Sequence, residues 1–205
     1  MTAELLEKFV PPSDADAPSS RVKWTRAEVE RIEDAGLWQD RKFELLEGEL
    51  YDRTAKQPLH AMVQTLLNEW AHLSFSAKLI RAESPIELAE RDNPSSQPLP
   101  DMVITTVSCF EFAGNNPDPS QVALIIEVSD TSLRDDLSVK AGLYARAEIK
   151  EYWVIDIRGR RLFAHRVPRN GDYSELRTLG ETESIAALAA PDKPLLISAI
   201  LPKAV

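Results

Sequence analysis

The sequence predicts an α/β fold of mixed α+β character, with a mixed central β-sheet flanked by helices. Strand-like and helix-like segments are interspersed along the 205 residues, without the regular strand–helix–strand alternation of a doubly wound protein. Residues 121–128 (QVALIIEV) are almost continuously apolar, as expected of a strand buried on both faces of a sheet. Together these patterns place one buried strand at the centre of a sheet that helices cover.

The N-terminal half of the chain is predicted to contain two helices and a hairpin. Thr25 is a suitable N-cap and Glu28 completes a capping box, so a helix should follow and run to about residue 34. Two strand-like runs within residues 43–53 (FELLEGELYDR) predict a β-hairpin. Residues 59–73 carry apolar side chains at helical spacing and predict an amphipathic helix with one face on a core.

The rest of the chain is predicted to alternate between short strands, loops and one further helix. Apolar runs indicate the strands, and clusters of Pro, Ser, Asn and Asp indicate the loops. The predicted elements are a weak strand at 86–89, a loop at 93–100, a strand at 101–106, a loop at 115–120, a helix at 135–147, strands at 152–157, 161–167 and 173–178, and an apolar run at 195–201.

Length and charge limit the function classes. Residues 1–20, rich in Pro, Ser and Asp, are predicted to be a flexible lead-in, and residues 21–205 a single domain. The net charge of −9 weighs against an avid, non-specific nucleic-acid binder, which normally carries a basic face. A local basic groove, a bound metal or a dimer could still accept a phosphate backbone.

Targeting and redox signals are both sparse. The sequence shows no signal-peptide pattern and no apolar run near the ~20 residues that cross a bilayer. The single cysteine, Cys109, allows no intrachain disulfide. We therefore expect a cytoplasmic protein that does not bind membranes.

Glu127 is the most informative residue, because it lies near the end of the most apolar predicted strand. An unpaired carboxylate in that environment would cost several kcal/mol or would stay protonated. A cation, a metal or hydrogen-bond donors must then compensate, unless the strand has already reached water at this point. Buried acids concentrate at functional sites, which favours the first interpretation.

Asp101 opens its own predicted strand after Pro98-Leu99-Pro100. Taken alone, it is typical of a polar residue that ends a loop. If it lies beside Glu127 on a neighbouring strand, the two carboxylates form an oxygen-rich site suited to Mg²⁺ or Mn²⁺.

Lys140 lies on the helix predicted after the Glu127 strand. Asp136, Lys140 and Tyr144 are spaced i, i+4 and i+8, so they form one polar stripe. The stripe could be a surface Asp–Lys pair, or the helix could direct Lys140 toward the two carboxylates. The sequence pattern leaves both interpretations open.

The order of these segments resembles that of a known family. The matching stretches are FELLEGEL, PLHAMVQTLL, PLPDMVI and ALIIEVSDTSLRDDLSVKAGLYARAEIKEYWVID, which span about residues 40–157. The sequence resembles the Uma2 (DUF820) family of restriction-endonuclease-like proteins, in the PD-(D/E)xK nuclease superfamily. This resemblance implies a restriction-endonuclease-like core and metal-dependent phosphodiesterase activity.

The resemblance also implies roles for individual residues. Asp101 and Glu127 would bind the metal, and Lys140 would take the catalytic lysine role. In the usual superfamily motif the lysine stands two residues after the glutamate, where this chain has Ser129. The family moves this lysine to the next helix, and Lys140 fits that position.

Four further residues match family positions. Glu44 matches an acidic position and could complete a second metal position or orient a water. His60 matches a helix-opening histidine and could be a general base or a substrate contact. Asp136 and Tyr144 match the stripe on the helix of Lys140.

Residues and resemblance together predict a divalent-metal-dependent endonuclease that uses Mg²⁺ or Mn²⁺ to hydrolyse phosphodiester bonds. The alternative is a catalytically weak or inactive nuclease-fold protein that acts as a binding or regulatory module, which the acidic charge suits. The expected partner is nucleic acid, DNA in preference to RNA, bound weakly and in a salt-sensitive way. A homodimer would suit an enzyme that cuts two strands.

Overall fold

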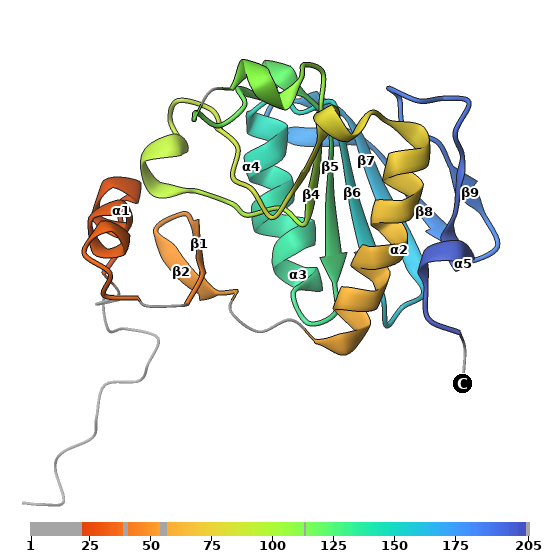
Figure 1. The fold of residues 1–205 in the computed structure, drawn as a ribbon, viewed down its shortest axis with the longest axis horizontal. Coiled ribbons are helices and arrows are strands. Elements are labelled where there is room, and N and C mark those ends of the chain that lie inside the picture. Colours follow the sequence, from red (N-terminus) through yellow and green to blue (C-terminus); the bar gives the residue numbers. More distant parts are fainter. Residues whose placement is uncertain (1–21, 39–40, 54–56, 113, 204–205) are drawn as a thin grey trace, which may run out of the picture.

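The computed structural model describes residues 22–38, 41–53, 57–112 and 114–203, so the predicted lead-in over residues 1–20 lies outside the described part. A six-stranded sheet with the order β3-β4-β5-β6-β7-β8 forms the centre (Figure 1). Strands β5 and β6 are parallel, and the other neighbours are antiparallel. The predicted mixed α/β class is therefore confirmed. The strands are β3 (Ile80–Ala82), β4 (Met102–Thr105), β5 (Val122–Ser129), β6 (Glu151–Asp156), β7 (Arg161–Arg169) and β8 (Asp172–Gly180).

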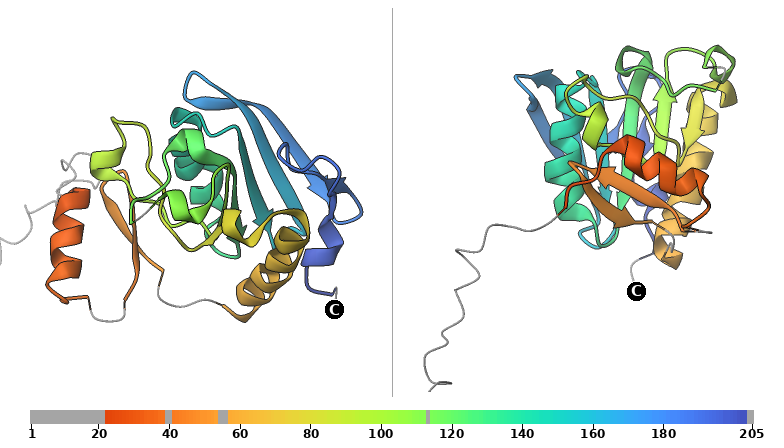
Figure 2. Two further views of the ribbon diagram at one scale, coloured as in Figure 1. Left: turned by 45° about the horizontal axis from the view of Figure 1, so that its top comes forward. Right: turned by 90° about the vertical axis from the view of Figure 1, so that its left-hand side faces the viewer.

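Helices cover both faces of this sheet (Figures 1 and 2). Each face has its own apolar cluster, one under the long helix α2 and one under the helix that connects β5 to β6. The first face carries α2 (Pro58–Ser74), α5 (Ile197–Ile200) and a small ladder of β9 (Ser184–Ile185) and β10 (Leu195–Leu196). The second carries α3 (Leu133–Asp135), the π-helical turn η6 (Asp136–Lys140) and α4 (Ala141–Arg146). Among the described residues, no helix has both the length and the apolar character needed to span a membrane.

The N-terminal elements lie beside the second face. Helix α1 (Arg26–Asp34) begins at Thr25 with the predicted capping box, in which Thr25 and Glu28 each accept from the other's backbone N–H. The hairpin consists of β1 (Phe43–Leu46) and β2 (Glu49–Asp52). Its two turn residues have positive φ, as type I′ hairpins require. A bridge from Leu45 to Gln97 attaches the hairpin to the loop before β4, and so brings β1 close to the sheet edge.

The predicted strand at residues 86–89 is wrong, and β3 lies earlier in the chain. Ile86 and Leu88 are buried, which gives the strand-like alternation seen in the sequence. Their backbone bonds, however, go to loops: the N–H of Glu87 donates to Pro117 O, and that of Leu88 donates to the Asn93 side chain. Short 3₁₀ turns connect the elements, at η2 (Ala77–Leu79), η3 (Asn93–Ser95), η4 (Cys109–Glu111) and η5 (Pro119–Gln121).

Strand β5 is buried on both faces, as its apolar run predicts. Leu124, Ile126 and Val128 belong to the cluster under α2, whereas Ile125 belongs to the cluster under α4. Because successive side chains of a strand point to opposite faces, Glu127 lies on the same face as Ile125. The sheet therefore directs Glu127 toward the helix that follows it in the chain.

Candidate active site

Asp101, directly before β4, and Glu127, near the end of β5, lie at the same end of two adjacent strands. Met102 pairs with Ile126, and extending this antiparallel register by one residue sets Asp101 opposite Glu127. The backbone N–H of Val128 donates to Asp101 Oδ2 at 2.8 Å. Each acid is 1% exposed, so Glu127 has not reached water, and Asp101 is not a solvated loop residue. The strand pairing thus brings the two predicted metal ligands together.

Lys140 reaches the same place from the helix. Its Nζ lies 2.9 Å from Glu44 Oε1, 2.9 Å from Glu127 Oε1 and 3.3 Å from Asp136 Oδ1. The Lys140 side chain is 2% exposed, so the interpretation as a surface Asp–Lys pair is wrong. Burial by itself lowers the pKa of Lys140, but the three carboxylates outweigh it and raise that pKa above its ordinary value. The side chain is therefore a buried ammonium.

Asp136 anchors the helix that carries Lys140. The hydroxyls of Ser129 and Ser132 donate to Asp136 Oδ2 at 2.5 Å and 2.6 Å, and the Tyr152 hydroxyl donates to Asp136 O at 3.0 Å. Ser129 stands two residues after Glu127 on one strand, so both point to the same face. The serine at the usual lysine position therefore holds an acid that contacts the relocated lysine. The predicted helix contains an unpredicted π turn at this point, and such turns are frequent at functional sites.

Glu127 has one satisfied oxygen and one unsatisfied oxygen. Its Oε1 accepts from Lys140 Nζ at 2.9 Å and from the Tyr144 hydroxyl at 3.1 Å. Its Oε2 is buried and has no hydrogen-bond partner among the residues that the structure describes. Burial, together with the nearby Asp136, Asp101 and Glu44, raises the pKa of Glu127 well above its ordinary value despite Lys140. The carboxyl group therefore has a strong tendency to take up a proton or a cation.

Asp101 is stabilised in its charged form. Nε2 of His60, in the first turn of α2, lies 3.2 Å from the Asp101 carboxylate. Burial raises the pKa of Asp101, but the hydrogen bond from His60, the charges of His60 and Arg53 and the Val128 N–H outweigh it, so that pKa is lowered. Neighbouring acids thus have opposite pKa shifts, as is common where a site separates two roles.

Glu44 belongs to the cluster through the hairpin. It lies in β1, is 2% exposed, and accepts at Oε1 from the backbone N–H of Leu99 at 2.8 Å. The same oxygen contacts Lys140 Nζ. The hairpin thereby contributes a third carboxylate to the lysine, which explains why the strand at residues 43–46 packs beside the sheet.

Arg53 is a site residue that the sequence analysis missed. It follows β2 directly, with Nη2 at 3.5 Å from Asp101 Oδ1 and Nε at 4.0 Å from Glu44 Oε2. Burial lowers its pKa, but Glu127, Glu44 and Asp101 outweigh burial, so the guanidinium stays charged. In the sequence it is one of many arginines at a strand end, and its place depends on where the hairpin docks.

Among the residues that the structure describes, the cluster contains more acids than permanent cations. Its described carboxylates are those of Glu44, Asp101, Glu127 and Asp136, and its described cations are Lys140 and Arg53. Excess buried negative charge favours binding of a cation. Among the described residues, no group of three or more His, Cys, Asp or Glu side chains has the arrangement to hold a metal alone. Mg²⁺, however, is commonly bound by one or two carboxylates with water and substrate phosphate, and Asp101 with Glu127 fits that pattern.

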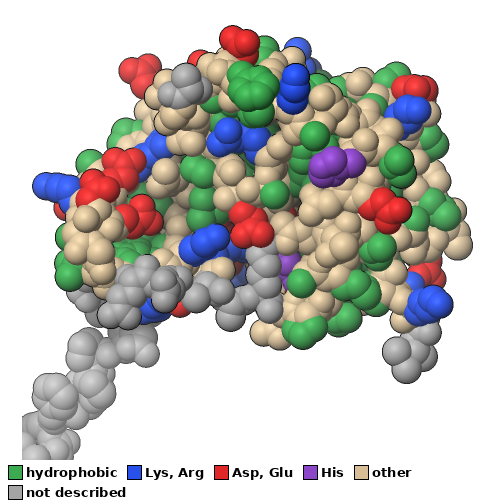
Figure 3. Space-filling model, viewed as in Figure 1, with side chains coloured by type: hydrophobic (Ala, Val, Ile, Leu, Met, Phe, Trp, Pro, Cys, Tyr) green, Lys and Arg blue, Asp and Glu red, His purple; other side chains and the backbone are tan. Residues whose placement is uncertain are grey.

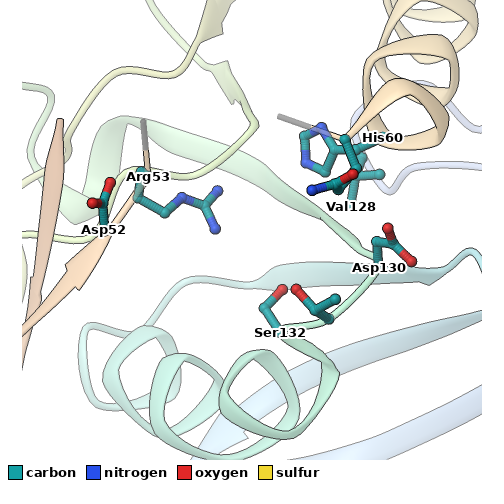
Figure 4. A pocket seen from close by; sticks show the side chains of 8 residues that line it. Asp52, Arg53, His60, Val128, Asp130 and Ser132 are labelled. Atoms are coloured by element: carbon teal, nitrogen blue, oxygen red, sulfur yellow. The ribbon is translucent and has the colours of Figure 1, made fainter. Parts of the chain in front are cut away.

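A pocket of about 120 Å³ adjoins this cluster, and its walls include Arg53, His60, Val128, Asp130 and Ser132. In Figure 4 the Arg53 guanidinium and the His60 ring point into the space between the hairpin, α2 and the start of α3, whereas Asp52 and Asp130 point away from it. A substrate group in this pocket would therefore meet a cation and an imidazole beside the buried carboxylates.

Comparison with known proteins identifies a family and a shared fold. The model of the Uma2 family, described as "Putative restriction endonuclease", matches residues 26–193. A crystal structure described as "a putative nuclease belonging to DUF820", from Anabaena variabilis ATCC 29413, matches with a TM-score of 0.51 and 15% identity, over 77% of this chain and 88% of that chain. The two proteins therefore share a fold. A search of curated proteins found no match.

Proposed function

Because the chain belongs to the Uma2 family, we propose that it is an endonuclease that hydrolyses phosphodiester bonds of nucleic acid with the help of Mg²⁺ or Mn²⁺. One observation carries the proposal. Glu127 presents a buried carboxylate oxygen that has no partner in the described part of the chain, beside Asp101 and Lys140. A fold that needed only packing at this position could use an apolar side chain at lower cost.

In this proposal Asp101 and Glu127 hold the metal. A divalent ion bound there would act as a Lewis acid, polarising a phosphoryl oxygen and making water a better nucleophile. Lys140, kept positive by its carboxylates, stabilises negative charge that develops on the phosphate. Glu44 and Asp136 position the Lys140 ammonium by direct contact.

His60 has two candidate roles. Its Nε2 faces Asp101, and its Nδ1 is buried without a hydrogen-bond partner among the described residues. Because His60 also lines the pocket, it could accept a proton from water or contact the substrate. His60→Gln separates these roles: loss of a general base lowers kcat and changes its pH profile, whereas loss of a substrate contact raises KM.

The alternative function is binding of nucleic acid without cleavage. The net charge is −9, and basic and acidic side chains are interspersed over the described part of the face in Figure 3. Such a surface suits weak, salt-sensitive binding, because few phosphates are neutralised away from the site. A module of this kind would bind metal and nucleic acid but leave the backbone intact.

The test is a nicking assay on supercoiled DNA, single-stranded DNA and RNA at low salt, with Mg²⁺, Mn²⁺ or EDTA. We expect cleavage, of DNA more than RNA, that stops in EDTA and in Glu127→Gln. Glu151→Gln is the matched control, since it changes a buried glutamate of the adjacent strand; circular dichroism first establishes that both variants are folded. Cleavage that persists in EDTA or in Glu127→Gln would indicate a contaminant, and the absence of any cleavage that depends on both metal and Glu127 would refute the proposal. Metal binding without any cleavage would favour the binding module.

A further inference from the structure

Arg53 is placed where a substrate could reach it. It lies directly after β2, and its guanidinium points into the pocket of about 120 Å³ that His60 also lines (Figure 4). A second pocket, of about 230 Å³, lies on the side of Glu44, Asp136 and Lys140, and Arg53 lines it as well. Arg53 therefore forms part of the wall between the two pockets that adjoin the acidic cluster.

The contacts of Arg53 with acids are long. Its nitrogens lie 3.5 Å from Asp101 Oδ1 and 4.0 Å from Glu44 Oε2, and its side chain is 23% exposed. Arg26 shows the alternative on the same molecule: it forms a fork with Glu87, with N–O distances of 2.8 Å and 3.0 Å. An arginine that neutralises an acid frequently adopts such a short, two-pronged geometry.

Phosphate is the ligand that best fits this position. A guanidinium presents five donors in a planar fork that matches two phosphate oxygens, and it stays charged at any ordinary pH. Arg53 lies near Asp101, Glu44 and Glu127, which would otherwise repel a phosphodiester. A partly exposed cation between these acids and the pocket offsets that repulsion.

We propose that Arg53 binds a backbone phosphate of nucleic acid in this pocket, next to the carboxylates of Asp101 and Glu127. This inference rests on the proposed function, because it assumes that the cluster receives nucleic acid. Arg53 is thus a substrate-binding residue, and its contribution is to affinity, separate from the holding of the metal. The same charge makes binding fall with salt, since each neutralised phosphate releases counterions.

The experiment measures the anisotropy of a short fluorescein-labelled DNA, duplex and single-stranded, across a salt series in Ca²⁺, with gels to verify that the DNA stays intact. The variants are Arg53→Met, Arg53→Lys and the control Arg177→Met, which removes the same charge from an exposed site on β8. Mn²⁺ binding is measured on each by calorimetry, and folding by urea denaturation. The native protein is assayed in parallel for cleavage in Mg²⁺ and Mn²⁺.

We expect Arg53→Met to weaken DNA binding about tenfold and to reduce the salt slope by about 1, because one charge-assisted contact is lost. Arg53→Lys should be intermediate, since it keeps the charge but loses the fork, and Arg177→Met should bind like the native protein. Mn²⁺ affinity should stay the same or rise in Arg53→Met, because a cation beside the carboxylates is removed.

Three results would overturn the inference: unchanged DNA affinity in Arg53→Met, weaker DNA binding accompanied by an equal loss of Mn²⁺ affinity, or no DNA binding by the native protein. In the first two cases Arg53 acts only on the fold or on the carboxylates. DNA binding that depends on Arg53 without any cleavage would refute the proposed nuclease activity and leave the role of Arg53 intact.

Discussion

Two buried glutamates on adjacent parallel strands differ in how many of their carboxylate oxygens have hydrogen-bond partners. Glu151, in β6, is completely buried, and Arg166 and the Trp153 indole donate to its Oε1, while the Leu188 N–H donates to its Oε2. Glu127, in β5, is equally buried but has an Oε2 with no partner among the described residues.

The two glutamates also differ in how many acids share the cation that pairs with them. Glu151 is balanced by one guanidinium, whereas Glu127 shares Lys140 with Glu44 and Asp136. A buried charge alone is therefore weak evidence for a functional site, since structural ion pairs are buried too. The feature that separates the two regions is a buried carboxylate oxygen without a described hydrogen-bond partner, in a cluster where several acids share one cation.

The largest expected effect is the loss of stability on removal of the cation that pairs with either buried glutamate. Lys140→Met leaves the carboxylates of Glu44, Glu127 and Asp136 without their common partner, and Arg166→Met leaves Glu151 without its own. Each should lower the free energy of unfolding by about 3–5 kcal/mol, measured by urea denaturation without metal. A loss below about 1 kcal/mol in Lys140→Met would mean that the ammonium is solvated.

The second-largest expected effect is stabilisation by divalent metal, which should depend on the Glu127 region and not on the Glu151 region. Mg²⁺ or Mn²⁺ should raise the melting temperature, with about 2.7 kcal/mol of added stability when the free metal reaches about a hundred times its Kd. Asp101→Asn should abolish most of this increase. Glu151→Gln should show the same increase as the native protein, although its melting temperature without metal is lower. The metal-free Asp101→Asn protein provides the baseline. An identical metal response in both variants would place the binding elsewhere.

A smaller effect concerns pH in the metal-free protein. The pKa of Glu127 is raised above the ordinary 4.5, so the folded state holds a proton that the unfolded state releases. That contribution to stability is complete below pH 4.5 and is lost as pH rises through the elevated folded-state pKa. The free energy of unfolding of the native protein, relative to Glu127→Gln, should therefore decrease from pH 4.5 upward. Parallel curves for the two proteins would contradict the raised pKa.

The smallest effect is expected at Tyr144. Tyr144→Phe removes the hydroxyl that donates to Glu127 Oε1 and keeps the packing of the ring. The loss should be about 1 kcal/mol in the free energy of unfolding, because Lys140 still satisfies that oxygen. The control is Tyr173→Phe, which removes a hydroxyl that donates to a backbone oxygen outside the site. Urea denaturation of both variants tests whether the loss at Tyr144 exceeds that of an ordinary buried hydroxyl. A loss of several kcal/mol would show that Tyr144 supports much more of the cluster than one hydrogen bond.

The features that were predictable from sequence are those that local spacing determines. The continuous apolar run around Glu127 predicted its strand and favoured its burial, and the i, i+4, i+8 spacing placed Asp136, Lys140 and Tyr144 on one stripe. The Thr25 capping box likewise marked the start of α1. In each case the signal lies within a few residues of the feature that it predicts.

The features that were not predictable depend on contacts between distant segments. Arg53 joins the site because the hairpin docks beside the sheet, and no local pattern distinguishes it from other strand-end arginines. Ile86 and Leu88 alternate like a strand although loop atoms, not a neighbouring strand, satisfy the backbone there. The bonds from Ser129 and Ser132 to Asp136 also depend on how the strand end meets the following helix.

The π turn at Asp136–Lys140 has an evolutionary consequence. A π turn contains one residue more than the α-helical turn that could replace it. Deletion of one residue within the turn would restore α-helical winding and place Lys140 three positions after Asp136 in place of four. A length change between Asp136 and Lys140 would therefore alter the contact of Lys140 with Asp136, whereas Lys140 and Tyr144, the two donors to Glu127, would keep their spacing of four residues.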